Sequence, residues 1–198
     1  MYAILKDVRI LDLSTIVLGP YATQILGDFG AEVIKIESPD GDLFRAVRPG
    51  RSAKMGAGYM NSNRNKRSIT LNLKTEEGKQ LFYKLAKTAD VIVHNMRNKT
   101  AIKLGIGYDD VKAHNPEIVY CGAQGFGEAG PLADAPAYDD IIQAASGFAH
   151  LNADAEGSPQ YAPTIIADKV VAHQLAIAVL GGLVNKFRTG KGCFIETP

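Results

Sequence analysis

The sequence has few of the residues that cross-link small secreted proteins or hold metal ions. Its 198 residues include two cysteines, Cys121 and Cys193, which are too few for a disulfide framework. This indicates a reducing compartment, and we expect a cytoplasmic protein. The four histidines share no ligand spacing with one another or with the cysteines, so the sequence predicts no metal site.

Excess charge of one sign is also missing. The net charge is +1, so no bulk electrostatic field attracts nucleic acid or an anionic membrane. The N-terminal segment lacks a basic stretch followed by an apolar stretch, and we predict no signal peptide. The apolar run 175–184 is too short to span a bilayer. We therefore expect neither a nucleic-acid partner nor a membrane partner.

The common catalytic and nucleotide-binding motifs are absent as well. The sequence contains no G-x-S-x-G, no P-loop and no C-x-x-C. The turn after the first predicted strand, STIVLGP at 14–20, does not match G-x-G-x-x-G, so it gives only weak support for dinucleotide binding.

Alternating apolar segments nevertheless predict a definite fold class. Strand 8–13, helix 21–29 and strand 32–37 form a strand–helix–strand unit with short connections, which is typical of a parallel sheet. We predict an α/β protein with a doubly wound, Rossmann-like sheet. Its further strands are 68–73, 90–95, 118–122 and 193–196, and its further helices are 75–87, 100–104, 108–115 and 137–147.

A long loop, 38–67, interrupts this alternation. It is rich in Gly, Pro, Asn and Arg, and it has seven basic residues: Arg45, Arg48, Arg51, Lys54, Arg64, Lys66 and Arg67. Two interpretations are open at this point. The loop is either a solvated basic segment or a clamp for an anionic ligand.

The segment 163–188 predicts a long helix with most of its surface buried, and Asp168 stands at its head. An acid in the first helical turn is common, so Asp168 has an ordinary structural interpretation. It is also where a rigid element would display a carboxylate nucleophile, kept ionised by the helix N-terminus. Polar residues that follow the predicted strands, among them Lys74 and Arg97, fit a nearby site for a large, phosphate-bearing ligand.

Several stretches together resemble one known family. They are LDLSTIVLGPYATQILGDFGAEVIKIE, the G-D-x-x-R of Gly41, Asp42 and Arg45, NRNKRSITLNLKTEEG, ADVIVHNMR, GFGEAGP, AYDDIIQAASG, IIADKVVA and RTGKGCFIE. The chain resembles the class III coenzyme A transferases (CaiB/BaiF-like), which include formyl-CoA transferase, carnitine CoA-transferase and the α-methylacyl-CoA racemases. The motifs cover essentially all 198 residues and occur in the family's order.

The resemblance carries expectations about domains and partners. Residues 1–198 would form the CoA-binding α/β domain, as the N-terminal portion of a longer chain. The family's smaller second domain and return segment would be absent from it. The full-length protein would be an interlocked homodimer that acts on an acyl-CoA and a carboxylic acid, with coenzyme A as a substrate and no metal.

The resemblance also assigns residues. Asp168 falls on the family's nucleophile, which passes the acyl group through aspartyl anhydride and aspartyl-CoA intermediates. Backbone N–H groups near Val17 and Leu18 would face the developing oxyanion. Tyr138 would lie beside the acyl group. The remaining positions implied to contact CoA are Ser38, Leu71, Lys74, Asn95, Met96, Arg97 and Lys103.

Departures from the family pattern narrow the function. Thr15 and Val17 replace the His and Gln of the formyl-CoA enzymes, which argues against formate and oxalate. Tyr138 stands where the racemases need a histidine, and a phenol with a pKa near 10 shuttles protons poorly at neutral pH.

We expect a CoA-transferase. The alternatives are an acyl-CoA racemase or isomerase that uses Asp168 as a base, and a CoA-binding module without chemistry. The second alternative also fits an inactive 198-residue piece, because the family's glycine-rich loop over the aspartate has no counterpart here.

Overall fold

The computed structural model describes residues 3–198, and its centre is one six-stranded parallel sheet with the order β3-β2-β1-β4-β5-β6. The strands are β1 (Arg9–Asp12), β2 (Glu32–Glu37), β3 (Lys66–Thr70), β4 (Val91–His94), β5 (Val119–Ala123) and β6 (Cys193–Thr197). The chain adds strands on one side of β1 and then, from β4 onward, on the other. The predicted doubly wound sheet is therefore confirmed, with its switch point between β1 and β4.

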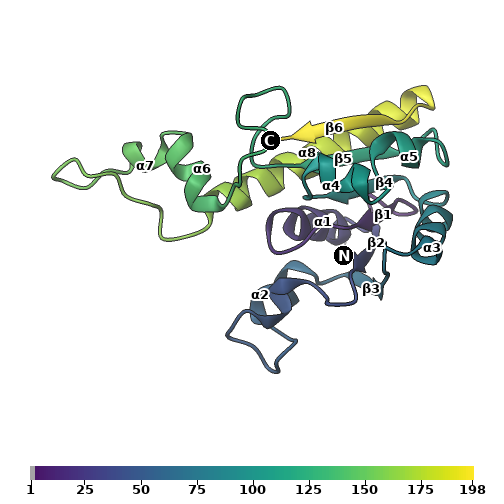
Figure 1. The fold of residues 1–198 in the computed structure, drawn as a ribbon, viewed down its shortest axis with the longest axis horizontal. Coiled ribbons are helices and arrows are strands. Elements are labelled where there is room, and N and C mark those ends of the chain that lie inside the picture. Colours follow the sequence, from purple (N-terminus) through teal and green to yellow (C-terminus); the bar gives the residue numbers. More distant parts are fainter. Residues whose placement is uncertain (1–2) are drawn as a thin grey trace.

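Helices cover both faces of the sheet (Figure 1). The helical segments are α1 (Leu18–Asp28), η1 (Leu43–Ala46), α2 (Ala57–Ser62), α3 (Glu76–Ala86), α4 (Asn98–Lys103), α5 (Tyr108–Lys112), α6 (Asp139–Ala145), α7 (Phe148–Leu151) and α8 (Ile166–Thr189). One core cluster joins α1 and α8 to the sheet, and a second joins α3, α4 and α5 to it. The four inner strands β1, β2, β4 and β5 are buried on both sides, whereas the outer strands β3 and β6 are partly exposed.

Helix α8 departs from the expectation that most of its surface is buried. Its buried side chains lie on one face, which packs on α1, β5 and β6, whereas Ile177 is 62% exposed and Phe187 is 66% exposed. That expectation was wrong because apolar residues occur all round this helix, so periodicity could not show which face would be covered.

The apolar run 175–184 was judged too short to cross a bilayer, but it is part of this longer helix. Among the described residues, α8 is the one helix long and apolar enough to span a membrane. Its packed face is what a core helix of an α/β domain shows, and such helices meet the same criterion of length and composition.

The segment predicted as one long loop, 38–67, contains η1 and α2, and β3 begins at Lys66, two residues before the predicted strand. Four of its seven basic residues form ion pairs inside the protein: Arg45 with Glu37, Arg64 with Asp28, Lys66 with Asp12 and Arg67 with Glu32. Arg45 and Lys66 are committed to buried carboxylates, which favours a structural role for these two, whereas the side chains of Arg64 and Arg67 are 49% and 70% exposed and their pairs are surface contacts.

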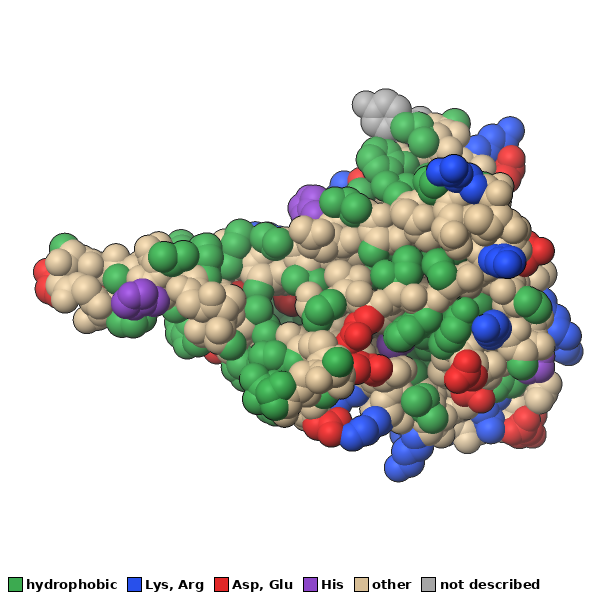
Figure 2. All heavy atoms as spheres, turned by 90° about the horizontal axis from the view of Figure 1, so that it is seen from above, with side chains coloured by type: hydrophobic (Ala, Val, Ile, Leu, Met, Phe, Trp, Pro, Cys, Tyr) green, Lys and Arg blue, Asp and Glu red, His purple; other side chains and the backbone are tan. Residues whose placement is uncertain are grey.

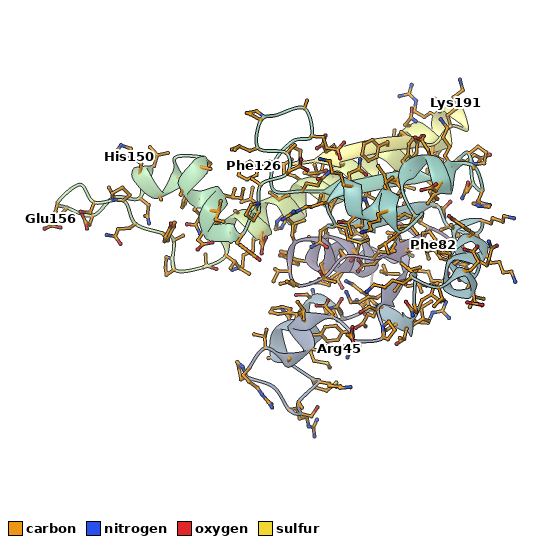
Figure 3. The ribbon with its side chains drawn as sticks, in the orientation of Figure 1. Arg45, Phe82, Phe126, His150, Glu156 and Lys191 are labelled. Atoms are coloured by element: carbon orange, nitrogen blue, oxygen red, sulfur yellow. The ribbon has the colours of Figure 1, made fainter. Side chains whose placement is uncertain are left out.

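Residues 139–165, here called the arm, extend away from the sheet and include α6, α7 and the loop before α8 (Figure 1). His150 and Glu156 lie on the outer part of the arm, whereas Phe126 lies in the loop after β5 (Figure 3). Hydrophobic side chains gather along the arm in Figure 2, and Leu151 is 86% exposed.

Candidate active site

Two neighbouring cavities lie at the edge where the strands end. The β2–β3 cavity, of about 300 Å³, is lined by residues that follow β1, β2, β3 and β4. The Asp168 cavity, of about 320 Å³, lies among the turn after β1, the start of α6 and the start of α8. Thr15 lines both cavities, so they are adjacent.

The structure distributes the predicted site residues over these cavities. Ser38, Leu71, Lys74 and Met96 line the β2–β3 cavity. Val17, Leu18, Asn95, Tyr138 and Asp168 line the Asp168 cavity. Arg97 lines a smaller adjoining cavity together with Asn95 and Tyr138. Lys103 is exposed on α4 and lies outside all three.

Asp168 is the third residue of α8 and is half-buried. The N-cap position belongs to Ile165, so Asp168 does not cap the helix. Within residues 3–198 the carboxylate of Asp168 has no hydrogen-bond or ion-pair partner, although its backbone N–H donates to Asp139 Oδ2 at 2.8 Å. Asp168 is thus an acid of the first helical turn, as the structural interpretation has it, but a carboxylate left without a partner inside a cavity is also available to a ligand.

The charge state of Asp168 is set by its surroundings. Burial raises the pKa of this carboxyl to about 6, and the negative charge of Asp139 acts in the same direction. The helix N-terminus was expected to stabilise the ionised form, but these two effects outweigh it. With a pKa of about 6, roughly nine-tenths of the carboxyl groups are still ionised at pH 7. The group is thus a more basic, and more nucleophilic, carboxylate than a solvated aspartate.

Helix α6 positions the start of α8. Asp139 accepts the N–H of Asp168, and Gln143 Nε2 donates to Asp139 Oδ1 at 2.5 Å. Gln143 Oε1 in turn accepts the N–H of Ala162 at 2.8 Å. Gln143 was not predicted as a site residue. Its spacing of four residues from Asp139 on a predicted helix was the available signal, because such pairs lie on one face.

The turn after β1 presents backbone donors to the Asp168 cavity. Val17 is the N-cap of α1 and Leu18 its first residue, so neither N–H has a partner within the helix. No other described group accepts from them, and both residues line the cavity. These two residues with unpaired N–H groups line the same cavity as Asp168, so the expected oxyanion site stays a prediction that the cavity accommodates.

Asn95 holds this turn from the side of β4. Its Oδ1 accepts the N–H of Thr15 at 2.9 Å, and its Nδ2 donates to the carbonyl of Thr15 at 2.9 Å. The side chain expected to contact CoA therefore already joins the two loops at the switch point. Tyr138 is 69% exposed as the N-cap of α6 and forms part of the cavity wall.

Fold and site together define a class of protein. It is a doubly wound α/β domain with an unpaired carboxylate, two free N–H groups and a separate cavity at the switch point of its sheet, an arrangement suited to a large ligand beside a nucleophile. Residues 5–198 match the family described as CoA-transferase family III, and the chain belongs to that family.

Individual relatives agree with this assignment. A succinate–glutarate CoA-transferase of Agrobacterium fabrum is 37% identical over 97% of this chain and 50% of its own length. A probable fatty acyl-CoA transferase of Mycobacterium tuberculosis is 39% identical over 94% of this chain and 48% of its own. A crystal structure of a CaiB/BaiF family protein from Brucella suis superposes with a TM-score of 0.91 at 37% identity, over 96% of this chain and 52% of that one. The chain thus spans about half the length of the curated relatives it matches.

Proposed function

We propose that this chain supplies the CoA site and the nucleophile of an enzyme that transfers CoA from an acyl-CoA to a carboxylic acid. The observation that carries the proposal is the unpaired carboxylate of Asp168 in the cavity that Val17 and Leu18 also line. The names of the relatives, which include succinate–glutarate and fatty acyl-CoA transferases, support the same reaction.

The proposed chemistry is a series of carbonyl substitutions at Asp168. Its carboxylate attacks the thioester carbon, the C–S bond breaks, and CoA leaves as a thiolate from an acyl–aspartyl anhydride. The thiolate attacks the aspartyl carbonyl, which releases the first acid as its carboxylate and leaves an aspartyl-CoA thioester. The acceptor carboxylate displaces the thiolate again, and the thiolate then attacks the acceptor carbonyl of the second anhydride. This last step forms the new acyl-CoA and frees Asp168.

Each step places negative charge on a carbonyl oxygen. The N–H groups of Val17 and Leu18 stabilise that oxygen, because they are fixed by the turn and need not reorganise during the reaction. Tyr138 lies at the mouth of the same cavity, where the acyl group would pass.

CoA itself would occupy the β2–β3 cavity, which Ser38, Leu71 and Met96 line, and would extend past Asn95 in the neighbouring Asp168 cavity. Lys103 would reach it only from outside these cavities. The side chains of Lys74 and Arg97 make no ion pair or hydrogen bond with any described residue, unlike the paired cations of the 38–67 segment. Uncommitted cations at the ends of parallel strands are suited to phosphate groups.

Lys74→Ala and Arg97→Ala should each weaken CoA binding by about 10-fold and weaken dephospho-CoA less, because the lost contact is to phosphate. Isothermal calorimetry with both ligands measures the difference. Lys84→Ala removes an exposed lysine of α3 outside the cavities and serves as the matched control. An equal loss for CoA and dephospho-CoA would mean that these side chains do not contact the phosphate that distinguishes the two.

The pH profile of acyl transfer should report the raised pKa of Asp168. Transfer needs the carboxylate, so the rate falls as pH drops through about 6. Asp139→Asn removes a nearby negative charge, which lowers the pKa of Asp168 and shifts the acid limb to lower pH. Asp140→Asn changes the exposed neighbouring acid and is the matched control, for which we expect the acid limb of the pH profile to stay at the wild-type pH. Initial rates between pH 4.5 and 8 test this prediction. If the acid limb of the Asp139 variant stays at the wild-type pH, the charge of Asp139 does not raise the pKa of Asp168.

The protein's wider organisation is part of the proposal. Residues 1–198 form the CoA-binding domain, a second domain and a partner subunit complete an interlocked homodimer, and the enzyme works in the cytoplasm without a metal. The match to about half of each relative's length supports a larger assembly, as do the exposed apolar side chains of the arm and of α8.

The test uses the complete gene product that carries residues 1–198, here called the intact protein. It is incubated with a panel of acyl-CoA donors and carboxylic acids, and new acyl-CoA is measured by mass spectrometry. Transfer that requires both substrates supports the proposal. Deuterium entering the α-carbon without an acceptor acid would instead indicate a racemase, an outcome that Tyr138 disfavours. CoA binding without either reaction would indicate a binding module.

A further inference from the structure

The turn Ser14–Leu18 has a backbone conformation that needs outside support. Ile16 has a φ of +70°, in the left-handed region, where a β-branched residue is strongly disfavoured. Such a residue persists only when its surroundings hold it. The next two residues, Val17 and Leu18, supply the unpaired N–H groups of the Asp168 cavity. The contacts that fix the backbone of Ile16 therefore also fix the direction of those N–H groups.

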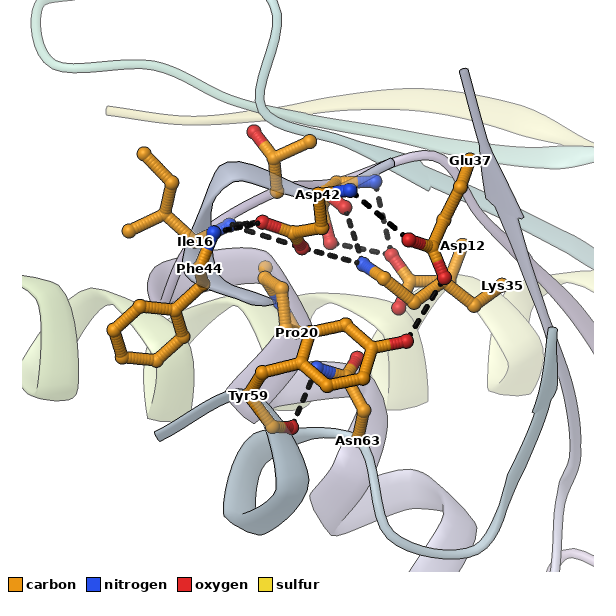
Figure 4. A network of polar contacts seen from close by, with 12 residues as sticks. Asp12, Ile16, Pro20, Lys35, Glu37, Asp42, Phe44, Tyr59 and Asn63 are labelled. Carbon is orange, nitrogen blue, oxygen red and sulfur yellow. Dashed lines mark hydrogen bonds and ion pairs between the residues drawn. The ribbon is translucent and has the colours of Figure 1, made fainter. Parts of the chain in front are cut away.

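A buried ion pair holds the turn (Figure 4). Asp42 Oδ1 accepts the N–H of Ile16 at 3.1 Å, and Asp42 Oδ2 pairs with Lys35 Nζ at 3.0 Å. The same Lys35 Nζ donates to the carbonyl of Ser14 at 2.8 Å. Lys35 is fully buried and Asp42 is 3% exposed, so water does not compete for these contacts. The pair therefore grips the turn at two backbone points.

A second set of contacts fixes Asp42 in turn. Its N–H donates to Glu37 Oε2 at 3.0 Å, and the guanidinium of Arg45 contacts the same carboxylate, with Nε 2.7 Å from Oε2. Gly41 adopts a φ of +79°, which suits glycine and lets the chain bend back toward Glu37. These contacts give a structural role to the G-D-x-x-R motif of Gly41, Asp42 and Arg45, which has no role in the proposed chemistry of Asp168.

We propose that Asp42, with Lys35 as its counter-ion, is a positioning residue for the oxyanion-binding N–H groups of Val17 and Leu18. Asp42 also lines the β2–β3 cavity proposed for CoA, but its carboxylate oxygens are engaged by the N–H of Ile16 and by Lys35 Nζ. It acts by keeping Ile16 in its disfavoured conformation, so that the donors are preorganised before charge develops on the carbonyl oxygen. This inference rests on the proposed acyl transfer at Asp168.

Asp90 provides a control at the end of the sheet where the strands begin. Asp90, which precedes β4, also accepts a backbone N–H, that of Arg9 at 2.9 Å, and also pairs with a lysine, Lys186 at 2.8 Å. Asp42→Asn and Asp90→Asn are thus the same substitution at an aspartate with the same kinds of partner, but only Asp42 contacts the turn, and the side chain of Asp90 is 23% exposed whereas that of Asp42 is fully buried. In the intact protein, Asp42→Asn should lower kcat by about 100-fold or more with KM for acyl-CoA within a few-fold. Asp90→Asn should leave both constants within about two-fold.

Hydrogen–deuterium exchange tests the positioning itself without activity. The amides of Thr15 and Ile16, which are both hydrogen-bonded in the wild-type turn, should exchange faster in Asp42→Asn and at an unchanged rate in Asp90→Asn. Unchanged exchange or unchanged kcat in Asp42→Asn overturns the proposal, as does a KM that rises in proportion to the fall in kcat. If the wild-type protein transfers no acyl group, the proposed function fails, and exchange at the turn still decides whether Asp42 holds it. Should Asp42→Asn not fold, Asp42→Glu keeps the charge opposite Lys35 and shifts the carboxylate, and the same fall in kcat at constant KM is expected.

Discussion

Asp168→Asn is expected to lower acyl transfer by about 10⁴-fold or more in the intact protein while CoA affinity changes only a few-fold. The carboxylate forms the covalent intermediates, and an amide in its place cannot form an anhydride with the acyl group. The β2–β3 cavity is built from other strands, so the contacts proposed for CoA remain. Transfer rates and calorimetric CoA affinity, measured on the same preparation, test both halves of the expectation.

Two controls separate this loss from damage to the fold. Because the pKa of Asp168 is raised in the folded protein, its charged form lowers the free energy of unfolding at neutral pH. Below about pH 4 the carboxyl is protonated in both the folded and the unfolded protein, and this effect is absent. Asp168→Asn should therefore be at least as stable as the wild-type protein at pH 7, and this advantage should disappear toward pH 4. Trapping with acyl-CoA and hydroxylamine should place a hydroxamate on the peptide that contains Asp168. A label on Asp139 or Asp140 instead, or transfer by the Asn variant, would show that the nucleophile lies elsewhere.

Lys66→Met is expected to lower the free energy of unfolding by about 3–5 kcal/mol, because it leaves Asp12 buried without its partner. Lys66 Nζ lies 2.9 Å from Asp12 Oδ2 and also donates to the carbonyl of Pro20 and to Asn63 Oδ1. The side chain of Asp12 is 0% exposed and that of Lys66 1%. Burial lowers the pKa of Lys66 to about 8 against the opposing charge of Asp12. For Asp12 the burial effect is outweighed by the charges of Lys66 and Lys35, which hold its pKa well below the usual range.

An exposed pair provides the comparison. Arg64 contacts Asp28 at 2.6 Å, but the Arg64 side chain is 49% exposed, so Arg64→Met should cost no more than about 1 kcal/mol. Urea unfolding at pH 7 measures both variants. Asp12→Asn combined with Lys66→Met should cost less than the sum of the single changes, since it leaves neither charge unpaired. Equal costs for Lys66→Met and Arg64→Met would contradict the buried ion pair.

Much of the fold was predictable because it depends on local periodicity. Short apolar runs separated by amphipathic segments predicted a parallel, doubly wound sheet, and all six strands are present with bounds within two residues of the prediction, apart from the end of β3, which comes three residues earlier. The place of Asp168 at the head of a long helix was predictable because it is a property of the chain itself, whereas its assignment as a site residue came from the family resemblance. The polar residues after each strand gather at one edge, because parallel strands all end there.

Other features depend on partners that are distant along the chain. The start of β3 at Lys66 is tied to Asp12, 54 residues earlier, and no local pattern shows that pairing. The short helices η1 and α2 lie in a segment whose Gly and Pro content indicated only a loop. The raised pKa of Asp168 comes from burial and from Asp139, which α6 brings against the start of α8.

Composition and periodicity by themselves determined the fold class of this protein, the edge of the sheet where its ligands would bind, and the place of Asp168 at the head of a long helix, whereas the family resemblance identified Asp168 as the candidate nucleophile. Only the tertiary structure decided which face of α8 is covered, which basic residues are paired and which are free, and that Asp42 and Lys35 hold the strained turn at Ile16. The physical reason is that hydrophobic periodicity is set by neighbouring residues, whereas burial of a charge or exposure of an apolar face depends on which distant segment packs against it.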